Sequence, residues 1–154
     1  MNTKVVGIVP ARLESKRLPG KALADICGLP MIIHTCKRAL LSKTLDDVYV
    51  ATDSKEIQEV AESFGIKSIM TSKNHKNSSE RAGEACKHID SNIIVNIQGD
   101  EPLLYPDHVD KITQPLLDDS EIQVSMGITK FSKKNSSSDF KAVMDSNNDL
   151  IYSS

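Results

Sequence analysis

The feature that most constrains this sequence is an apolar run near its N-terminus that ends in a cationic turn. Residues Val5 to Val9 are mainly β-branched, which is typical of a strand buried in a parallel sheet. The turn that follows carries Arg12, Arg17 and Lys21. In an open α/β sheet, the loops after the carboxyl ends of the strands form the ligand-binding edge. We therefore expect this turn to bind an anion, and the working hypothesis is the triphosphate of a nucleotide.

Strand and helix patterns alternate along residues 1–120 and predict the fold class. Strand patterns lie at 5–9, 47–52, 66–70 and 92–98, and the last is apolar on both faces, which predicts a central strand. Helix patterns begin after Pro30, after Asp53 with Glu56 as a capping box, at 78–81 and at Pro106; Pro115 is expected to kink or end the last helix. This order predicts an α/β fold with a mostly parallel sheet and helices on both faces.

The last part of the chain is richer in strand patterns. These lie at 122–129, 140–145 and 150–153, with a turn at Asn147-Asn148 between the last two, and they predict a mixed edge of the sheet. Residues 130–139 are polar and are expected to form a surface loop. We interpret 1–154 as one nucleotide-binding α/β domain that is incomplete at its C-terminus, because the chain stops directly after a strand pattern.

Composition argues against several classes of function. The formal net charge is -2, aromatic residues make up 4% and tryptophan is absent, so neither a basic field nor stacking platforms favour nucleic acid. The apolar runs are too short to cross a bilayer, and no signal peptide precedes the first strand. The three cysteines show no paired spacing and are expected to be thiols of a reducing compartment. We expect a cytoplasmic protein without a membrane or nucleic-acid partner.

A carboxylate is expected at the same sheet edge as the cations. Gln98 ends the strand pattern at 92–98, and Asp100 and Glu101 follow it. Asp is a hard oxygen ligand suited to a Mg²⁺ ion shared with phosphate oxygens. Two simpler interpretations stay open: the cations could form a solvated loop, and Asp100 could cap a turn. Neither the P-loop pattern nor G-x-G-x-x-G occurs in the chain, which disfavours P-loop and dehydrogenase functions.

Several motifs taken together resemble one family. The stretch Pro10-Ala11-Arg12-x-x-Ser15-x-Arg17-Leu18-Pro19-Gly20-Lys21 is similar to the first motif of the 3-deoxy-manno-octulosonate cytidylyltransferases (CMP-Kdo synthetases). Further similar motifs follow in the family's order: Gly28-x-Pro30-Met31-Ile32, Ala51-Thr52-Asp53, Glu80-Arg81 and Asn96-x-Gln98-Gly99-Asp100-Glu101-Pro102. The resemblance covers essentially the whole chain but only the N-terminal portion of the family's length.

The resemblance implies a fold, a reaction and a set of site residues. The fold is of the nucleotide-diphospho-sugar transferase type, often dimeric, and we expect a homodimer at full length. The implied reaction joins CTP and a 3-deoxy-ulosonic acid (Kdo or a close relative) to give CMP-sugar and pyrophosphate, for lipopolysaccharide or surface-polysaccharide biosynthesis. Asp100 would bind Mg²⁺ and act in catalysis with Arg12 and Lys21. The nucleotide-binding set is Ala11, Arg12, Ser15, Arg17, Lys21, Ser79, Arg81 and Gln98.

Two departures from the family pattern leave the acceptor open. Ser78 stands where the family usually has glycine, and Leu13-Glu14 stands where it commonly has Tyr-Ala. One alternative is a related nucleotidyltransferase with another acceptor, such as a sialic-acid-like sugar or a polyol phosphate. The other is a truncated nucleotide-binding module that binds CTP without turnover.

Overall fold

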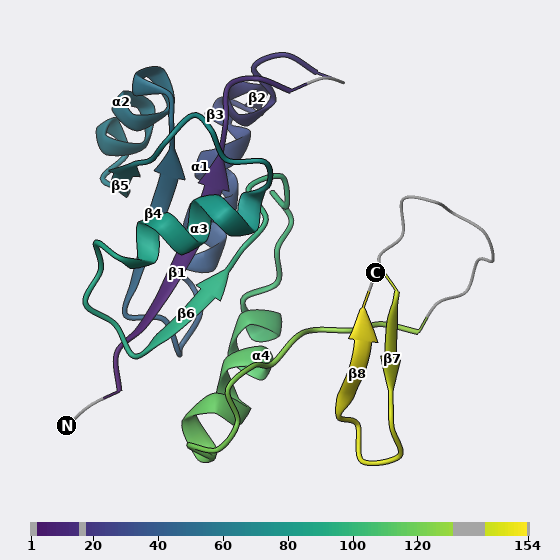
Figure 1. Ribbon diagram of the computed structural model, residues 1–154. Coiled ribbons are helices and arrows are strands. Elements are labelled where there is room, and N and C mark those ends of the chain that lie inside the picture. Colours follow the sequence, from purple (N-terminus) through teal and green to yellow (C-terminus); the bar gives the residue numbers. More distant parts are fainter. Residues whose placement is uncertain (1–2, 16–17, 131–140, 154) are drawn as a thin grey trace.

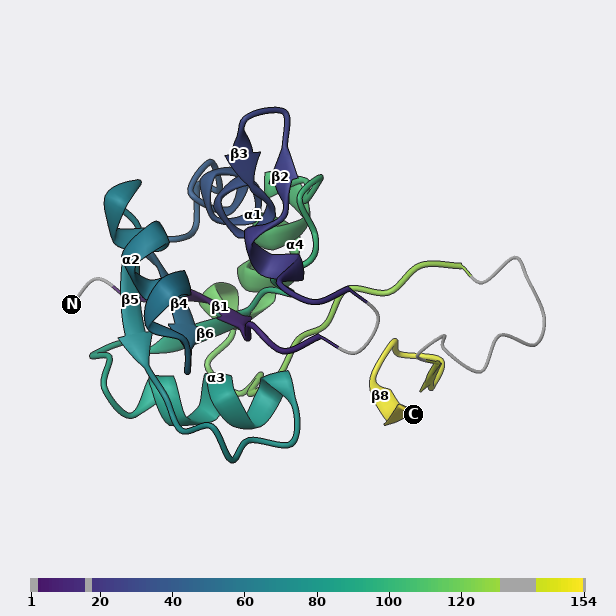
Figure 2. The same ribbon diagram turned by 90° about the horizontal axis from the view of Figure 1, so that it is seen from above.

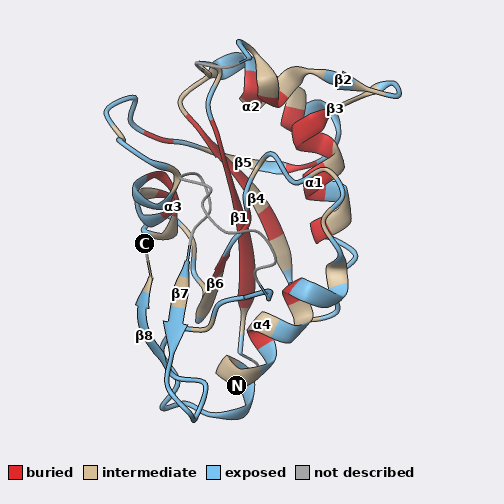
Figure 3. Cartoon of the chain, turned by 90° about the vertical axis from the view of Figure 1, so that its right-hand side faces the viewer, coloured by how far each residue is buried: buried red, intermediate tan, exposed pale blue. Residues whose placement is uncertain are grey.

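A four-stranded parallel sheet forms the centre of the molecule (Figure 1). The computed structural model describes residues 3–15, 18–130 and 141–153. The strands lie in the order β5-β4-β1-β6, with bounds β1 Val5–Ala11, β4 Asp47–Thr52, β5 Lys67–Met70 and β6 Ile93–Asn96. Ile8 of β1 pairs with Tyr49 of β4 and with Asn96 of β6. Every residue of β1 is buried, as its β-branched run predicts (Figure 3).

Helices cover both faces of this sheet, as predicted. They are α1 Met31–Ala39, α2 Lys55–Ser63, α3 Ser78–Cys86 and α4 Pro106–Asp118. One core cluster joins Val9 of β1 to Ile33, Ile57 and Val109, so α1, α2 and α4 pack on one face. The second cluster joins Ile8 and Ala51 to Ala82 and Ala85, which places α3 on the other face. Figure 2 shows α3 across the sheet from α1 and α4.

The predicted centre of the sheet was wrong. Among the described strands, β6 pairs with β1 alone and lies at an edge, while β1 and β4 are the inner strands. Ile93 and Ile94 of β6 are only partly buried. The pattern at 92–98 is apolar on both faces because α3 packs on one face of β6 and α4 on the other. A strand at the edge of a sheet can be covered in this way as well as a central one.

The predicted mixed edge was wrong for the described part of the chain, because the four strands of the central sheet are all parallel. The antiparallel strands form two-stranded sheets of their own, β2 Asp25–Ile26 with β3 Leu29–Pro30 and β7 Ala142–Met144 with β8 Leu150–Ser153. The β7–β8 hairpin turns at Asn147-Asn148 as predicted, with φ of 69° at Asn148. No strand forms over residues 122–130, where the sequence predicted one at 122–129. The loop expected at 130–139 lies almost wholly outside the described residues.

Helix boundaries agree with the sequence to within a few residues. Ser54 caps α2 by accepting a hydrogen bond from the N–H of Ile57 at 3.4 Å, so the capping box assigned to Asp53 was wrong by one residue. Helix α3 begins at Ser78, within the predicted start at 78–81, and ends at Cys86. Helix α4 begins at Pro106 and continues past Pro115. In the part of the chain that is described, no helix is long and apolar enough to span a bilayer.

Candidate functional site

A pocket of about 360 Å³ opens where the chain leaves β1 and β6 at the carboxyl edge of the sheet. Three segments line it: the turn after β1, the residues after β6, and the start of α3 with the loop before it. The predicted edge therefore carries a real cavity. Of the predicted site residues, the lining includes Ala11, Arg12, Ser15, Lys21, Arg81, Gln98 and Asp100.

One predicted residue that the structure describes, Ser79, is not brought to this pocket. Ser79 is exposed and is not part of the lining, whereas its neighbour Ser78 is. The first turn of α3 therefore presents the residue that replaces the family glycine. Arg17 lies outside the described residues.

Gly99, which follows β6, packs closely against the end of β1. A Cβ at this position would lie 2.7 Å from the carbonyl oxygen of Pro10 and 3.1 Å from Ile32 Cδ1. The hydroxyl of Thr35 donates to the Gly99 carbonyl at 3.3 Å. Because Gly99 does not have a positive φ, the glycine is required for close packing rather than for an unusual backbone conformation. This packing sets Asp100 beside the turn after β1.

Lys21 and Asp100 form an ion pair across the pocket. Lys21 opens the short 3₁₀ helix η1 (Lys21–Leu23), directly after Gly20, whose φ is 67°. Its Nζ donates to Asp100 Oδ2, and both side chains remain partly exposed, at 31% and 45%. The predicted phosphate ligand and the predicted metal ligand therefore contact each other directly.

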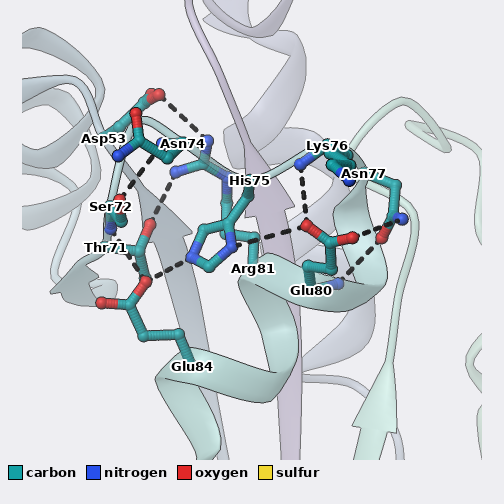
Figure 4. Close-up of polar contacts among 10 residues, drawn as sticks. All are labelled: Asp53, Thr71, Ser72, Asn74, His75, Lys76, Asn77, Glu80, Arg81 and Glu84. Carbon is teal, nitrogen blue, oxygen red and sulfur yellow. Dashed lines mark hydrogen bonds and ion pairs between the residues drawn. The ribbon is translucent and has the colours of Figure 1, made fainter.

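Arg81 is the buried cation of the site. It is only 4% exposed, although α3 carries it near the pocket. Its Nη1 donates to Thr71 Oγ1 at 2.6 Å, and its Nη2 donates to Asp53 Oδ2 at 3.0 Å. Both partners follow strand ends, Thr71 after β5 and Asp53 after β4. Asp53, expected to cap a helix, instead neutralises Arg81 (Figure 4).

The loop from Thr71 to Asn77 is bound to α3 by two glutamates, as Figure 4 shows. Glu84 accepts from the N–H of Ser72 at 2.8 Å and from Nε2 of His75. The hydrogen bond from His75, helped by the one from Ser72, lowers the pKa of Glu84 below its ordinary value. Glu80 accepts from the N–H of Lys76 at 2.8 Å. The loop is therefore fixed to the helix at both ends.

This loop supplies pocket residues that sequence reasoning missed. His75, Lys76 and Asn77 all line the pocket, and none of them is among the predicted site residues. The available signal was the spacing of Asn77 and Glu80, since a capping residue followed three positions later by Glu marks a helix start. Asn77 Oδ1 indeed accepts from the N–H of Glu80 at 2.9 Å.

The donor set fits a metal ion shared with a nucleotide. Within the described ranges, no group of three or more His, Cys, Asp or Glu side chains is arranged so that it could hold a metal ion, which disfavours there a metal cage built from protein ligands. Mg²⁺ in nucleotide sites takes one or two carboxylates, and phosphate oxygens and water fill its other positions. Asp100 offers one such carboxylate on the pocket wall.

Comparison with known proteins points to one family. The model of a family described as "Cytidylyltransferase" matches residues 6–154. The 3-deoxy-manno-octulosonate cytidylyltransferase of Geobacter metallireducens is 41% identical over 155 residues, which cover 97% of this chain and 60% of that protein. The protein of the same name from Francisella tularensis subsp. novicida is 40% identical over 151 residues, which cover 94% and 60%. This chain thus spans about 60% of the length of these curated relatives.

Solved structures agree in fold. A CMP:2-keto-3-deoxy-manno-octonic acid synthetase complexed with CTP matches with a TM-score of 0.84 and 34% identity, over 99% of this chain and 64% of that chain. A 4-diphosphocytidyl-2C-methyl-D-erythritol synthase from Anaerococcus prevotii matches with a TM-score of 0.56 at 15% identity, over 97% and 63%. This second likeness concerns the fold alone.

Proposed function

Since this chain belongs to the cytidylyltransferase family, we propose that its pocket binds CTP for transfer of the cytidylyl group to a 3-deoxy-ulosonic acid such as Kdo. One observation carries the proposal: Arg12, Lys21 and Asp100 line the same pocket. The two cations follow β1 and the carboxylate follows β6, its parallel neighbour. Cations beside a single carboxylate suit a triphosphate with its metal ion. A cytoplasmic location and a homodimer of the longer protein are part of the same proposal.

The ion pair between Lys21 and Asp100 prepares both side chains for this ligand. Each neutralises the other in the structure, so neither charge is left without a partner at the pocket. A triphosphate would give the Lys21 ammonium a new anionic partner, and a divalent metal ion would give the Asp100 carboxylate a new cationic partner. Binding of the two together would therefore exchange one ion pair for two favourable contacts.

The chemistry requires positioning more than a reactive side chain. An anomeric hydroxyl of the sugar acid would attack the α-phosphorus of CTP, and pyrophosphate would leave. When bound, Mg²⁺ would neutralise charge on the phosphate oxygens. Arg12 and Lys21 would orient the triphosphate and offset its charge, which is the main contribution of the protein in phosphoryl-type transfer. Gln98 would contact the base or sugar, and Ala11 would lie against the nucleotide.

Pyrophosphate release tests the reaction. The expected result is release from CTP with a 3-deoxy-ulosonic acid and none with a sugar 1-phosphate; equal release with both would contradict the acceptor class. Asp100→Asn should abolish Mg²⁺-dependent turnover while the unfolding transition stays unchanged. Lys87→Gln, at an exposed position after α3 that is not part of the pocket lining, serves as the neutral control.

A second candidate function is nucleotide binding without turnover. The observation in its favour is that the chain spans only about 60% of the length of its curated relatives. Titration with CTP distinguishes the two candidates when it is run beside the pyrophosphate assay. Binding without release by the 154-residue chain, with release gained when the chain is extended to the length of its relatives, would identify a binding portion of a cytidylyltransferase.

A further inference from the structure

The loop before α3 brings an additional cation to the pocket. Lys76 lines the same cavity as Arg12 and Lys21, but it comes from a different segment of the chain. No motif considered in the sequence includes it. The pocket therefore receives positive charge from the turn after β1 and from the loop between β5 and α3.

The backbone that carries Lys76 is held in place. Its N–H donates to Glu80 Oε2 at 2.8 Å, and the next residue, Asn77, caps α3 by accepting from the N–H of Glu80 at 2.9 Å. Asn77 Nδ2 also donates to Glu80 Oε1 at 3.3 Å. These reciprocal bonds fix the Lys76–Asn77 junction to the first turn of the helix.

His75, the residue before Lys76, is held against α3. Its Nε2 hydrogen-bonds to Glu84, and its Nδ1 lies 3.9 Å from Glu80 Oε2. The ring thus lies between two carboxylates one helical turn apart, and its side chain is only 17% exposed (Figure 4). Lys76 is flanked by two anchored residues, so little backbone entropy remains to be lost when its side chain contacts a ligand.

The charge balance of the pocket makes Lys76 available to an anion. Lys21 is paired with Asp100, and Arg81 is paired with Asp53. Within residues 3–15, 18–130 and 141–153, Lys76 and Arg12 form no ion pair with a carboxylate. A lysine on a fixed backbone, exposed to solvent at a cavity and without an ion-pair partner, is suited to bind a phosphate group as a point charge.

We propose that Lys76 binds the phosphate groups of the nucleotide and that Glu80 positions Lys76 for this contact. The inference rests on the proposed function, because it takes CTP as the ligand. It adds a binding residue from the loop before α3 to those on the turns after β1 and β6. It also gives Glu80 a role in binding, beyond its part in starting the helix.

Titration of Lys76→Gln with CTP and with cytidine tests the binding role. We expect the dissociation constant for CTP to rise roughly tenfold, as for loss of a charged hydrogen bond, with cytidine binding unchanged and the salt dependence of CTP binding reduced. Lys76→Arg should keep most of the affinity. The control is Lys73→Gln, since Lys73 lies in the same loop, is exposed and is not part of the pocket lining.

The outcomes separate this inference from the proposed function. If the unmodified chain binds CTP and Lys76→Gln binds it as well as Lys73→Gln does, the inference is wrong and the proposed function stands. An equal loss of affinity for CTP and cytidine would also overturn the phosphate contact. If the unmodified chain does not bind CTP, both fail.

A double-mutant cycle tests the positioning role of Glu80. Glu80→Ala should weaken CTP binding several-fold in the unmodified chain but clearly less in the Lys76→Gln background, because the contact that Glu80 supports is already lost. Glu80→Gln keeps an acceptor oxygen for the N–H of Lys76 and should restore most of the affinity. Fully additive effects, or no recovery with Gln, would show that Glu80 only stabilises the helix.

Discussion

Among the glycines of the chain, Gly99 leaves the least room for a side chain. Its missing side chain lets the chain after β6 pass against the Pro10 carbonyl, where a Cβ would come within 2.7 Å of the oxygen. Backbone cannot move aside as a flexible side chain can. The contact therefore links the two strand ends that supply Lys21 and Asp100.

We predict that Gly99→Ala lowers the free energy of unfolding by about 1–3 kcal/mol, the usual cost of overpacking. The matched control is Gly83→Ala in α3, where nothing lies within 4 Å of the added Cβ; it should raise stability by about 0.5–1 kcal/mol, because alanine favours the helix. Urea unfolding of both variants measures the difference. Equal effects at the two positions would contradict the close packing of Gly99.

At the scale of elements, Arg81 ties α3 to the ends of two strands. It reaches Asp53 after β4 and Thr71 after β5, and it lies almost fully buried. Removing one partner of a buried ion pair leaves the other charge desolvated and unpaired. The position of α3 over the sheet thus depends on a polar contact as well as on the small apolar cluster around Ala82 and Ala85.

Arg81→Met should therefore lower the free energy of unfolding by about 3 kcal/mol. Arg81→Met combined with Asp53→Asn should cost less than the sum of the two single changes, because the unpaired carboxylate is then removed. Chemical denaturation of the four proteins gives the coupling. Additive losses would mean that the two side chains do not stabilise each other.

The contact between Glu84 and the loop before α3 makes stability depend on acid pH. Hydrogen bonds from His75 and Ser72 lower the pKa of Glu84 from its ordinary value of 4.5, so the folded state favours the ionised carboxyl. This contribution is fully present above the unfolded value and is lost as pH falls through the lower folded pKa.

Comparison of Glu84→Gln with the unmodified chain should show this pH range. We expect the unmodified chain to be more stable at pH 7, and the difference in unfolding free energy to shrink as the pH falls below 4.5. Glu59→Gln, exposed on α2, is the control and should leave the slope unchanged. A stability difference for Glu84→Gln that stays constant down to the acid transition would contradict the contribution of the Glu84 carboxylate.

For the molecule as a whole, the sequence predicted the architecture better than it predicted the contacts between distant segments. The β-branched run of β1 and the strand–helix alternation predict a parallel sheet covered on both faces, and the motif order predicts the family that the comparisons confirm. Local patterns contain these signals. The partner of Arg81, the edge position of β6 and the separate β7–β8 hairpin depend on how distant segments meet, which local patterns do not encode.

For the candidate site as well, the sequence predicted which strand ends meet but not every residue that lines the pocket. The turn after β1 and Asp100 lie together as the shared sheet edge implies. Ser78 rather than the predicted Ser79 lines the pocket, because the first turn of a helix points neighbouring residues in different directions. Lys76 was missed because its place at the pocket depends on how Glu80 and Glu84 fold the loop back onto α3.

The central claim is that the joined ends of β1 and β6 hold the triphosphate of CTP. Calorimetric titration of the unmodified chain and of Lys21→Ala with CTP and CMP tests it most directly. We predict that the unmodified chain binds CTP and that Lys21→Ala weakens CTP binding roughly tenfold, with a much smaller effect on CMP, which lacks the outer phosphates. Absence of CTP binding, or an equal loss for CTP and CMP, would contradict the account.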